Sequence, residues 1–221
     1  MSTQFRISEL FHSLQGEGPL AGTPAHFLRL QGCTVGCQWC DTRYSWSPEG
    51  GEPQPIEALF ERALALGPAD LLVVTGGEPL EHAGLSELLN GALERWTTVE
   101  VETSGIAPPP RSHARLRWNV SSKLPSATAR WEDTWRHSAA WLAESNATFK
   151  LVVGGGDDIA DALRMIEAHH LPAHRVMLMP QGMRDAELRE RAVELAEICK
   201  RHGFRLSARL HVWLWGAKRG V

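Results

Sequence analysis

Short apolar segments alternate with longer amphipathic ones along most of the chain, and this pattern limits the possible folds more than any other feature. Valine- and leucine-rich runs of about five residues indicate buried strands, whereas apolar residues repeating every three or four positions indicate helices. Strands are predicted over residues 5–10, 26–30, 71–75, 98–102, 116–120, 148–153, 175–179 and 205–207. Helices are predicted over residues 56–66, 85–95, 135–144, 159–169 and 185–202. Strands separated by helices form βα units, so the sequence predicts an α/β fold with a mainly parallel sheet.

The length of the chain decides how far such a sheet can close. A closed eight-stranded βα barrel takes about 200 to 250 residues or more, and this chain has 221. Its composition, 43% hydrophobic and 22% charged, is sufficient for a substantial core, and no repeat or linker divides it. We therefore expect a single domain over residues 1–221 that forms an incomplete, TIM-like βα barrel.

Charge and hydropathy argue against several classes of protein. The net charge is −3, from 23 basic and 26 acidic residues, whereas domains that hold nucleic acid are usually basic. No apolar run approaches the roughly 20 residues of a membrane span. The first ten residues lack the basic and apolar stretches of a signal peptide. We expect a cytoplasmic protein that binds neither nucleic acid nor a membrane.

Three of the four cysteines are clustered, with the spacing C-x3-C-x2-C at Cys33, Cys37 and Cys40. Clustered thiols indicate a metal site rather than a disulfide framework. Three thiolates can hold a [4Fe–4S] cluster and leave one iron open to a substrate or cofactor. The alternative is a zinc loop, for which a fourth ligand would be needed. The distant Cys199 fits a buried apolar position on a helix.

Polar and glycine-rich segments follow the predicted strands. They are residues 31–42, 75–79, 103–105, 121–123, 154–156 and 180–182. Ligands of parallel sheets bind at the carboxyl ends of the strands. The sequence therefore predicts that these six segments converge on one site.

The cysteine motif and a second motif one βα unit later together resemble the radical S-adenosylmethionine superfamily. The second motif is the segment 75–79, Thr-Gly-Gly-Glu-Pro. Glycines allow close approach of a backbone, and a carboxylate or carbonyl can accept a hydrogen bond from an ammonium group. The resemblance implies that the open iron binds the methionine moiety of S-adenosylmethionine. One electron from the cluster would then release a 5′-deoxyadenosyl radical.

Further motifs narrow the resemblance to one family. They are residues 11–18 (FHSLQGEG), 27–33 (FLRLQGC), 40–42 (CDT), 102–105 (ETSG), 121–123 (SSK), 179–182 (MPQG) and 210–221 (LHVWLWGAKRGV). Together they resemble the 7-carboxy-7-deazaguanine synthases of the queuosine pathway. The resemblance implies conversion of 6-carboxy-5,6,7,8-tetrahydropterin to 7-carboxy-7-deazaguanine with release of ammonia, by hydrogen abstraction at C6 and ring contraction. It also implies a magnesium-dependent homodimer and an external flavodoxin- or ferredoxin-like electron donor.

The resemblance assigns a role to each motif position, with the radical itself supplied by the cofactor. Cys33, Cys37 and Cys40 would hold the cluster, and Thr42 would bind Mg²⁺. S-adenosylmethionine would lie against Trp39, Cys40, Asp41, Gly76, Gly77, Glu78, Gly105, Ser121, Ser122, Lys123, Pro180 and Gln181. The pterin would lie against Leu14, Gln15, Gly16, Arg29, Thr103 and the terminal carboxylate of Val221. For Arg29 the chemistry is direct, because a guanidinium pairs with a carboxylate in bidentate geometry.

Two positions depart from the family pattern. Ser122 stands where the family usually has proline, which predicts a looser loop because a fixed φ is lost. Ala217 stands where the family tail commonly has asparagine. Close to it, the alternation of Trp213 and Trp215 predicts a terminal strand with one face packed against the core or a partner subunit.

Two other functions compete with this interpretation. A glycyl-radical activase would share the cysteine and glycine motifs but would act on a protein, so it should not need residues 14–18, Arg29 or the tail. A binding module with a zinc loop would contain zinc and no iron. Metal content and turnover of the pterin separate these alternatives.

Overall fold

The computed structural model describes residues 3–221, and its strands form one nine-stranded sheet in the order β3-β1-β2-β4-β5-β6-β7-β8-β9. The strands are β1 (Gln4–Leu14), β2 (Pro24–Leu30), β3 (Glu52–Pro55), β4 (Leu71–Gly76), β5 (Thr98–Thr103), β6 (Leu116–Val120), β7 (Ala147–Val153), β8 (Val176–Pro180) and β9 (Arg205–Leu206). Every neighbouring pair from β2 to β9 is parallel, and β1 is antiparallel to both β2 and β3. The predicted α/β class and mainly parallel sheet are confirmed.

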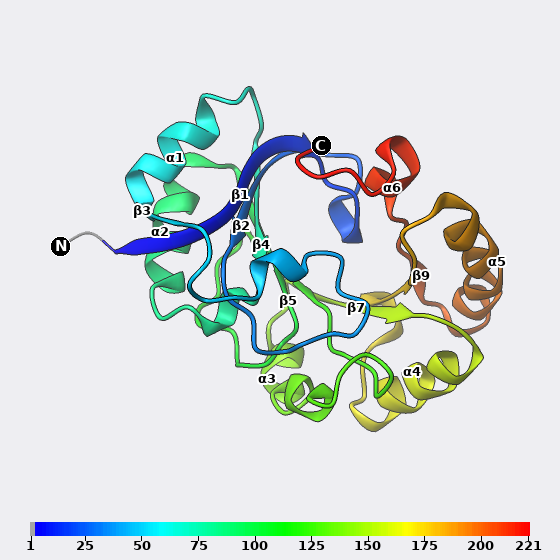
Figure 1. Ribbon diagram of the computed structural model, residues 1–221. Coiled ribbons are helices and arrows are strands. Elements are labelled where there is room, and N and C mark those ends of the chain that lie inside the picture. The colour runs from blue at the N-terminus through cyan, green and yellow to red at the C-terminus, as the bar shows by residue number, and fades with distance from the viewer. Residues whose placement is uncertain (1–2) are drawn as a thin grey trace.

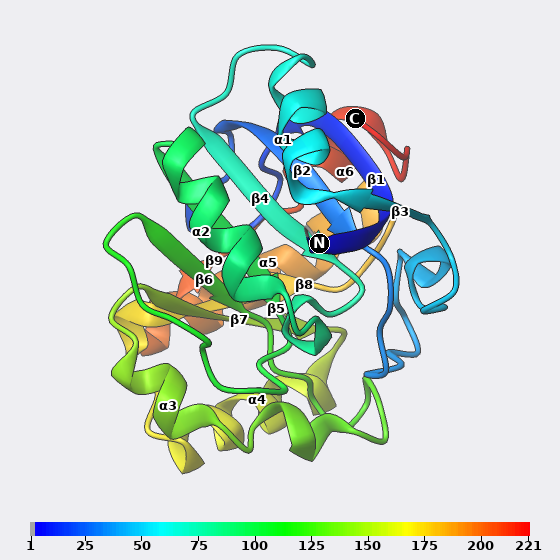
Figure 2. The same cartoon turned by 90° about the vertical axis from the view of Figure 1, so that its left-hand side faces the viewer.

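Helices cover the outer face of the curved sheet, except the last one, which lies at the rim beside the C-terminal tail (Figure 1). They are α1 (Ile56–Leu64), α2 (Leu85–Arg95), α3 (Ser138–Ala143), α4 (Gly156–Ala168), α5 (Asp185–His202) and α6 (Leu210–Trp215). Figure 2 shows α1 and α2 lying across the strands from one side, with α3 and α4 next to each other beyond β7. Among residues 3–221 no helix combines the length and the apolarity that a membrane crossing requires.

The side chains of β5 show how the strands divide the interior into two environments. Val99 and Val101 are fully buried in the main apolar core, which lies between the sheet and the helices. Because alternate residues of a strand face opposite sides, Glu100 and Glu102 face the concave side of the sheet. The outer face therefore supplies the packing energy, and the concave face carries polar groups.

The barrel is open, as predicted, and polar contacts bridge the gap between its first and last segments. The Gly18 N–H donates to Ser207 Oγ at 2.9 Å, and the Leu210 N–H donates to the Gly16 carbonyl at 2.8 Å. Beyond these contacts the chain turns back, so that its C-terminus ends beside the end of β1 (Figure 1). The end of β1 and the last residues of the chain thus lie at the same rim.

Several local predictions were wrong. The tail forms helix α6 instead of a strand; Trp213 and Trp215 are 57% and 41% exposed, and Val212 is the residue that this helix buries. The short strand β3 was missed because two of its four residues are proline, which disfavours strands. The helix expected over 135–144 is shorter in the structure: residues 135–137 form a turn that follows the 3₁₀ helix Trp131–Thr134, and α3 covers only Ser138–Ala143.

Candidate active site

Five of the six polar segments predicted at strand ends line one pocket, on the side to which the carboxyl ends of the parallel strands point. The loop that follows β2 lies along this side of the sheet (Figure 2). The sixth segment, residues 154–156, lies outside the lining. Of the individually predicted residues, all line the pocket except Gly105 and Ser122. Predicted site residues as far apart in the sequence as Leu14 and Val221 therefore line the same pocket.

The cysteine loop is held by hydrogen bonds within the loop and to the segment that follows it. The Cys33 N–H donates to the Trp46 carbonyl at 3.1 Å, and the Cys40 N–H donates to the Cys37 carbonyl at 3.2 Å. The Trp46 indole N–H also reaches Cys40 Sγ at 3.3 Å. All three cysteines are free thiols and line the pocket.

The environment of these thiols favours an added positive group. Burial raises the pKa of Cys33 to about 11 and also raises the pKa of Cys37. A thiolate in such a place needs compensation, which coordinated metal supplies. Within residues 3–221 no three His, Cys, Asp or Glu side chains gather closely enough to hold a single ion. In a cubane, by contrast, each cysteine binds a different iron.

The glycine motif packs directly against the cysteine loop. The Gly77 N–H donates to the Leu30 carbonyl and the Glu78 N–H to the Gly32 carbonyl, both at 2.9 Å. A Cβ on Gly77 would stand 1.9 Å from the Gly32 carbonyl oxygen and 3.1 Å from Cys33 Cβ. Only glycine allows the two motifs this approach.

The Glu78 carboxylate, in contrast, is used inside the protein. It accepts hydrogen bonds from the Ser104 N–H at 2.7 Å, the Leu80 N–H at 3.0 Å and the Thr103 hydroxyl at 2.5 Å. These bonds tie the loop after β4 to the loop after β5. Gly76 and Gly77 line the pocket beside Glu78, so the motif also brings backbone to the pocket.

Ser122 does not loosen its loop. Its hydroxyl donates to the Thr134 carbonyl at 3.0 Å, and the Thr134 hydroxyl accepts from the Lys123 N–H at 2.8 Å. The Lys123 ammonium donates to Ser121 Oγ at 3.1 Å and lies 5.9 Å from the centre of the Trp39 ring. Side-chain hydrogen bonds thus replace the rigidity that a proline would give.

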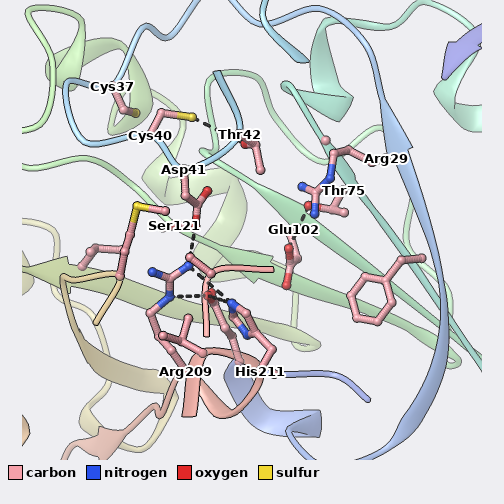
Figure 3. Close-up of a pocket in the computed structure, with 18 of the residues that line it drawn as sticks. Arg29, Cys37, Cys40, Asp41, Thr42, Thr75, Glu102, Ser121, Arg209 and His211 are labelled. Carbon is pink, nitrogen blue, oxygen red and sulfur yellow. Dashed lines mark hydrogen bonds and ion pairs between the residues drawn. The ribbon is translucent and has the colours of Figure 1, made fainter. Parts of the chain in front are cut away.

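Arg29 points into the pocket from β2 but already has a partner (Figure 3). Its Nε donates to Glu9 at 2.7 Å. Glu9 also accepts from the Tyr44 hydroxyl at 2.6 Å and from Arg219 Nε at 2.9 Å. Although burial opposes ionisation of Glu9, these hydrogen bonds hold its pKa below the usual value. Val221, two residues beyond Arg219, lines the same pocket.

A buried ionic network in the pocket was not predicted. Glu17 pairs with Lys150 and, at 3.0 Å, with Arg209, which also pairs with Asp41 (Figure 3). Arg209 in addition donates to the Gly182 carbonyl. Burial opposes ionisation of Glu17, but the charges of Lys150 and Arg209 hold its pKa well below the usual range. The sequence signal that was overlooked is a single lysine in the apolar run 147–153.

Glu102 is the second functional candidate that the sequence analysis missed. It lies at the carboxyl end of β5, lines the pocket, and accepts from the Thr75 hydroxyl at 2.8 Å and from Gln15 Nε2 at 3.2 Å. The alternation of valine and acid in Thr98–Thr103 could have indicated it, because both faces of a central parallel strand are buried. Its carboxylate gives the pocket an acceptor for N–H donors.

Apolar and hydroxyl groups complete the lining. The Phe11 and Phe27 rings are stacked with their centres 4.8 Å apart, which gives the pocket a flat aromatic wall. Thr42 also lines the pocket, with its hydroxyl 3.5 Å from Cys40 Sγ. Gln181, in the loop after β8, accepts from Arg191 at 2.8 Å. The pocket thus combines a thiol-rich end, an aromatic wall and several charged groups.

Comparison with known proteins places this site in a family. Residues 28–117 match the model of the Radical SAM superfamily. The chain is 40% identical over 219 residues to the 7-carboxy-7-deazaguanine synthase of Pyrobaculum aerophilum, covering 97% of this chain and 96% of the relative. The enzyme of the same name from Hyperthermus butylicus is 34% identical, with 96% and 93% coverage.

A solved structure agrees with these matches. The crystal structure of QueE from Escherichia coli is 28% identical in sequence, with a TM-score of 0.68 over 94% of this chain and 95% of that one. The chain therefore belongs to the 7-carboxy-7-deazaguanine synthase family of the radical S-adenosylmethionine superfamily.

Proposed function

We propose that this pocket converts 6-carboxy-5,6,7,8-tetrahydropterin into 7-carboxy-7-deazaguanine and ammonia, the reaction of the family. The observation that carries the proposal is the convergence of the cysteine loop, the glycine motif and the C-terminal tail on one pocket. Because segments from both ends of the chain build this pocket, we also propose that all 221 residues form one domain.

The superfamily uses a [4Fe–4S] cluster and S-adenosylmethionine, and the residues present fit both. Cys33, Cys37 and Cys40 would each bind one iron, which leaves the fourth for the cofactor. The close packing at Gly77 keeps the glycine motif beside the cysteine loop, where its carbonyls can accept from the cofactor's ammonium group. When bound, these groups supply the 5′-deoxyadenosyl radical that abstracts hydrogen from C6 of the pterin.

The remaining groups of the pocket bind and orient the pterin. Phe11 and Phe27 offer a flat face to the ring system, and Gln15 and Glu102 offer hydrogen-bonding groups to its nitrogens. Arg29 would exchange Glu9 for the substrate carboxylate, which also suits its guanidinium. The tail, fixed at Arg219, brings the terminal carboxylate of Val221 to the same pocket.

Mg²⁺ would bind at Thr42. A single hydroxyl is a sparse ligand set, but Mg²⁺ keeps several waters and takes further ligands from its substrate. Thr42 supports this role because it lines the pocket beside the cysteine loop. The neighbouring Asp41 is already paired with Arg209, so it serves to fix the loop rather than to bind the metal.

Three further proposals concern the setting of the reaction. A cluster that must be reduced requires an external flavodoxin- or ferredoxin-like donor. Free cysteines beside a metal site fit a reducing compartment such as the cytoplasm. Exposed tryptophans on α6 give an apolar surface that fits the homodimer of the family.

The test is turnover of carboxytetrahydropterin under anaerobic, reducing conditions with reconstituted cluster, S-adenosylmethionine and Mg²⁺. We expect formation of 7-carboxy-7-deazaguanine, and a cubane cluster in which about three of the irons are bound by cysteine. Absence of product from fully loaded protein would contradict the proposal. For the metal, Thr42→Ser should retain the response to added Mg²⁺ and Thr42→Val should lose it; equal responses would exclude Thr42 as a ligand.

A further inference from the structure

Glu100 is fully buried on the concave side of the sheet and takes no part in the reaction described above. It lies on β5, two residues before Glu102 and therefore about 7 Å deeper in the barrel than that pocket residue. It does not line the pocket, although Gln15, which contacts it, does. Burying a carboxyl group completely at the floor of a site costs free energy, so its neighbours must explain why it is there.

The side chain of Glu100 contacts the side-chain amide of Gln15 and holds it in place. Gln15 Nε2 donates to Glu100 Oε1 and, at 3.2 Å, to Glu102 Oε1. The other end of the same amide, Gln15 Oε1, accepts from the Glu17 N–H at 3.1 Å. This last contact fixes which end of the amide is the NH₂ group, so both carboxyl groups can act only as its acceptors.

Glu100 has no direct ion pair, although the charge of the nearby Lys150 acts to lower its pKa. Lys150 and Arg209 both pair with Glu17, and Arg209 is shared with Asp41. Glu102 opens to the pocket and accepts from Thr75 and Gln15. Glu100 Oε2, in contrast, has no hydrogen-bond partner among residues 3–221. A buried carboxylate with no ion pair of its own, beside a second carboxylate, is very unfavourable. The carboxyl group avoids this cost when it is protonated.

We propose that Glu100 is a positioning residue that holds the amide of Gln15 from below the pocket and does so as a neutral carboxylic acid. Burial, together with the charge of Glu102, raises its pKa to about 8, which agrees with this state near neutral pH. Ionisation at higher pH adds a charge next to Glu102 and disturbs the floor of the substrate site. The role of Gln15 in substrate binding rests on the proposed function; the protonation of Glu100 does not.

The first measurement needs no turnover. Infrared difference spectra of the folded protein, compared between wild type and Glu100→Gln at about pH 7, should show a protonated carboxyl band that the variant lacks. The exposed Glu61 provides the control, because Glu61→Gln should leave the band in place. Thermal unfolding gives a second signal: the melting temperature of Glu100→Gln should rise relative to wild type as pH increases from about 5 to about 9.

Kinetics then separate positioning from a general loss of structure. Glu100→Gln keeps a neutral acceptor, so it should stay within about threefold of wild-type activity at neutral pH and should lose the alkaline decline of wild type near pH 8. Glu100→Ala removes the acceptor and should raise KM by roughly tenfold with little change in kcat. Parallel melting curves of wild type and Glu100→Gln across this pH range, with no band lost, would overturn the proposal. If no protein turns over the pterin, the proposed function fails while the spectra still decide the state of Glu100.

Discussion

Replacing Gly77 by alanine tests the claim that the glycine motif exists to bring two loops together. Gly77 is outside the positive-φ region, so alanine introduces no backbone strain of its own. Its Cβ would stand 1.9 Å from the Gly32 carbonyl oxygen and 2.4 Å from the carbonyl carbon, whereas ordinary contact begins near 3.4 Å. Both obstacles are backbone atoms, which cannot rotate away. The two loops must therefore separate by about 1 to 1.5 Å, depending on direction.

The cost of that separation can be worked from the contacts it breaks. The hydrogen bonds Gly77 N–H to Leu30 and Glu78 N–H to Gly32, both 2.9 Å, contribute about 1 kcal/mol each. We expect the free energy of unfolding to fall by about 2 to 3 kcal/mol. We also expect cleavage of S-adenosylmethionine to fall by about 100-fold, because misplacement of reacting groups by about 1 Å has that effect.

The assay is formation of 5′-deoxyadenosine by reconstituted protein, normalised to iron content. Gly156→Ala is the matched control: its Cβ meets nothing within 4 Å, and it is the first residue of helix α4. This control should change stability by less than about 0.5 kcal/mol and leave cleavage unchanged. If Gly77→Ala behaved like Gly156→Ala, the close approach would have no functional meaning and the argument from packing would be wrong.

Three further changes have expected outcomes. Lys150→Met leaves the buried Glu17 with one cation fewer and should lower the free energy of unfolding by about 3 to 5 kcal/mol in denaturant titrations; a loss below about 1 kcal/mol would contradict burial of the pair. In wild type, the lowered pKa of Glu17 gives stability that is complete above its ordinary value of 4.5 and is lost as pH falls below it, which acid unfolding can measure. Arg219→Ala removes the contact with Glu9 and the stacking of the guanidinium on Tyr44, 3.6 Å from its ring centre. It should raise KM for the pterin about threefold and speed proteolysis of the tail. Unchanged proteolysis would show that Arg219 does not hold the tail in place. Cys199→Ala should retain full iron content and Cys37→Ala should lose it, because Cys199 lies on the buried face of α5 and contacts the Arg205 carbonyl; equal iron losses would refute the assignment of cluster ligands.

The parts of the fold that could be predicted are those set by local periodicity. Strands β4 to β8 and helices α2 and α5 were found because each carries its apolar pattern within a short stretch. The glycine and cysteine motifs were found because their spacing is local too. Strand β3 and helix α6 were missed because neither has a local reason to form: β3 exists as the antiparallel partner of β1, and α6 packs where the chain returns to the rim.

The ionic part of the site was missed for a related reason, since its members meet only in the folded chain. Glu17 and Lys150 are separated by 133 residues, and Glu17 and Arg209 by 192. No spacing in the sequence relates them, and charged residues are usually exposed. Only the burial of Lys150 in an apolar strand gave a local sign that an interior partner must exist.

Arg209 also explains how an open barrel can hold a defined site. The sheet has β3 and β9 as its edge strands, and among residues 3–221 no strand pairing joins β9 back to β1 or β3. The Arg209 side chain instead forms ion pairs with Glu17, in the segment after β1, and with Asp41 in the cysteine loop. It also donates a hydrogen bond to the Gly182 carbonyl after β8. The gap of the barrel is therefore closed by the same side chain that orients the loop beside the cluster ligands. It follows that loosening the closure must also disturb the cofactor end of the pocket, although Arg209 itself lies outside every sequence motif that identified the family.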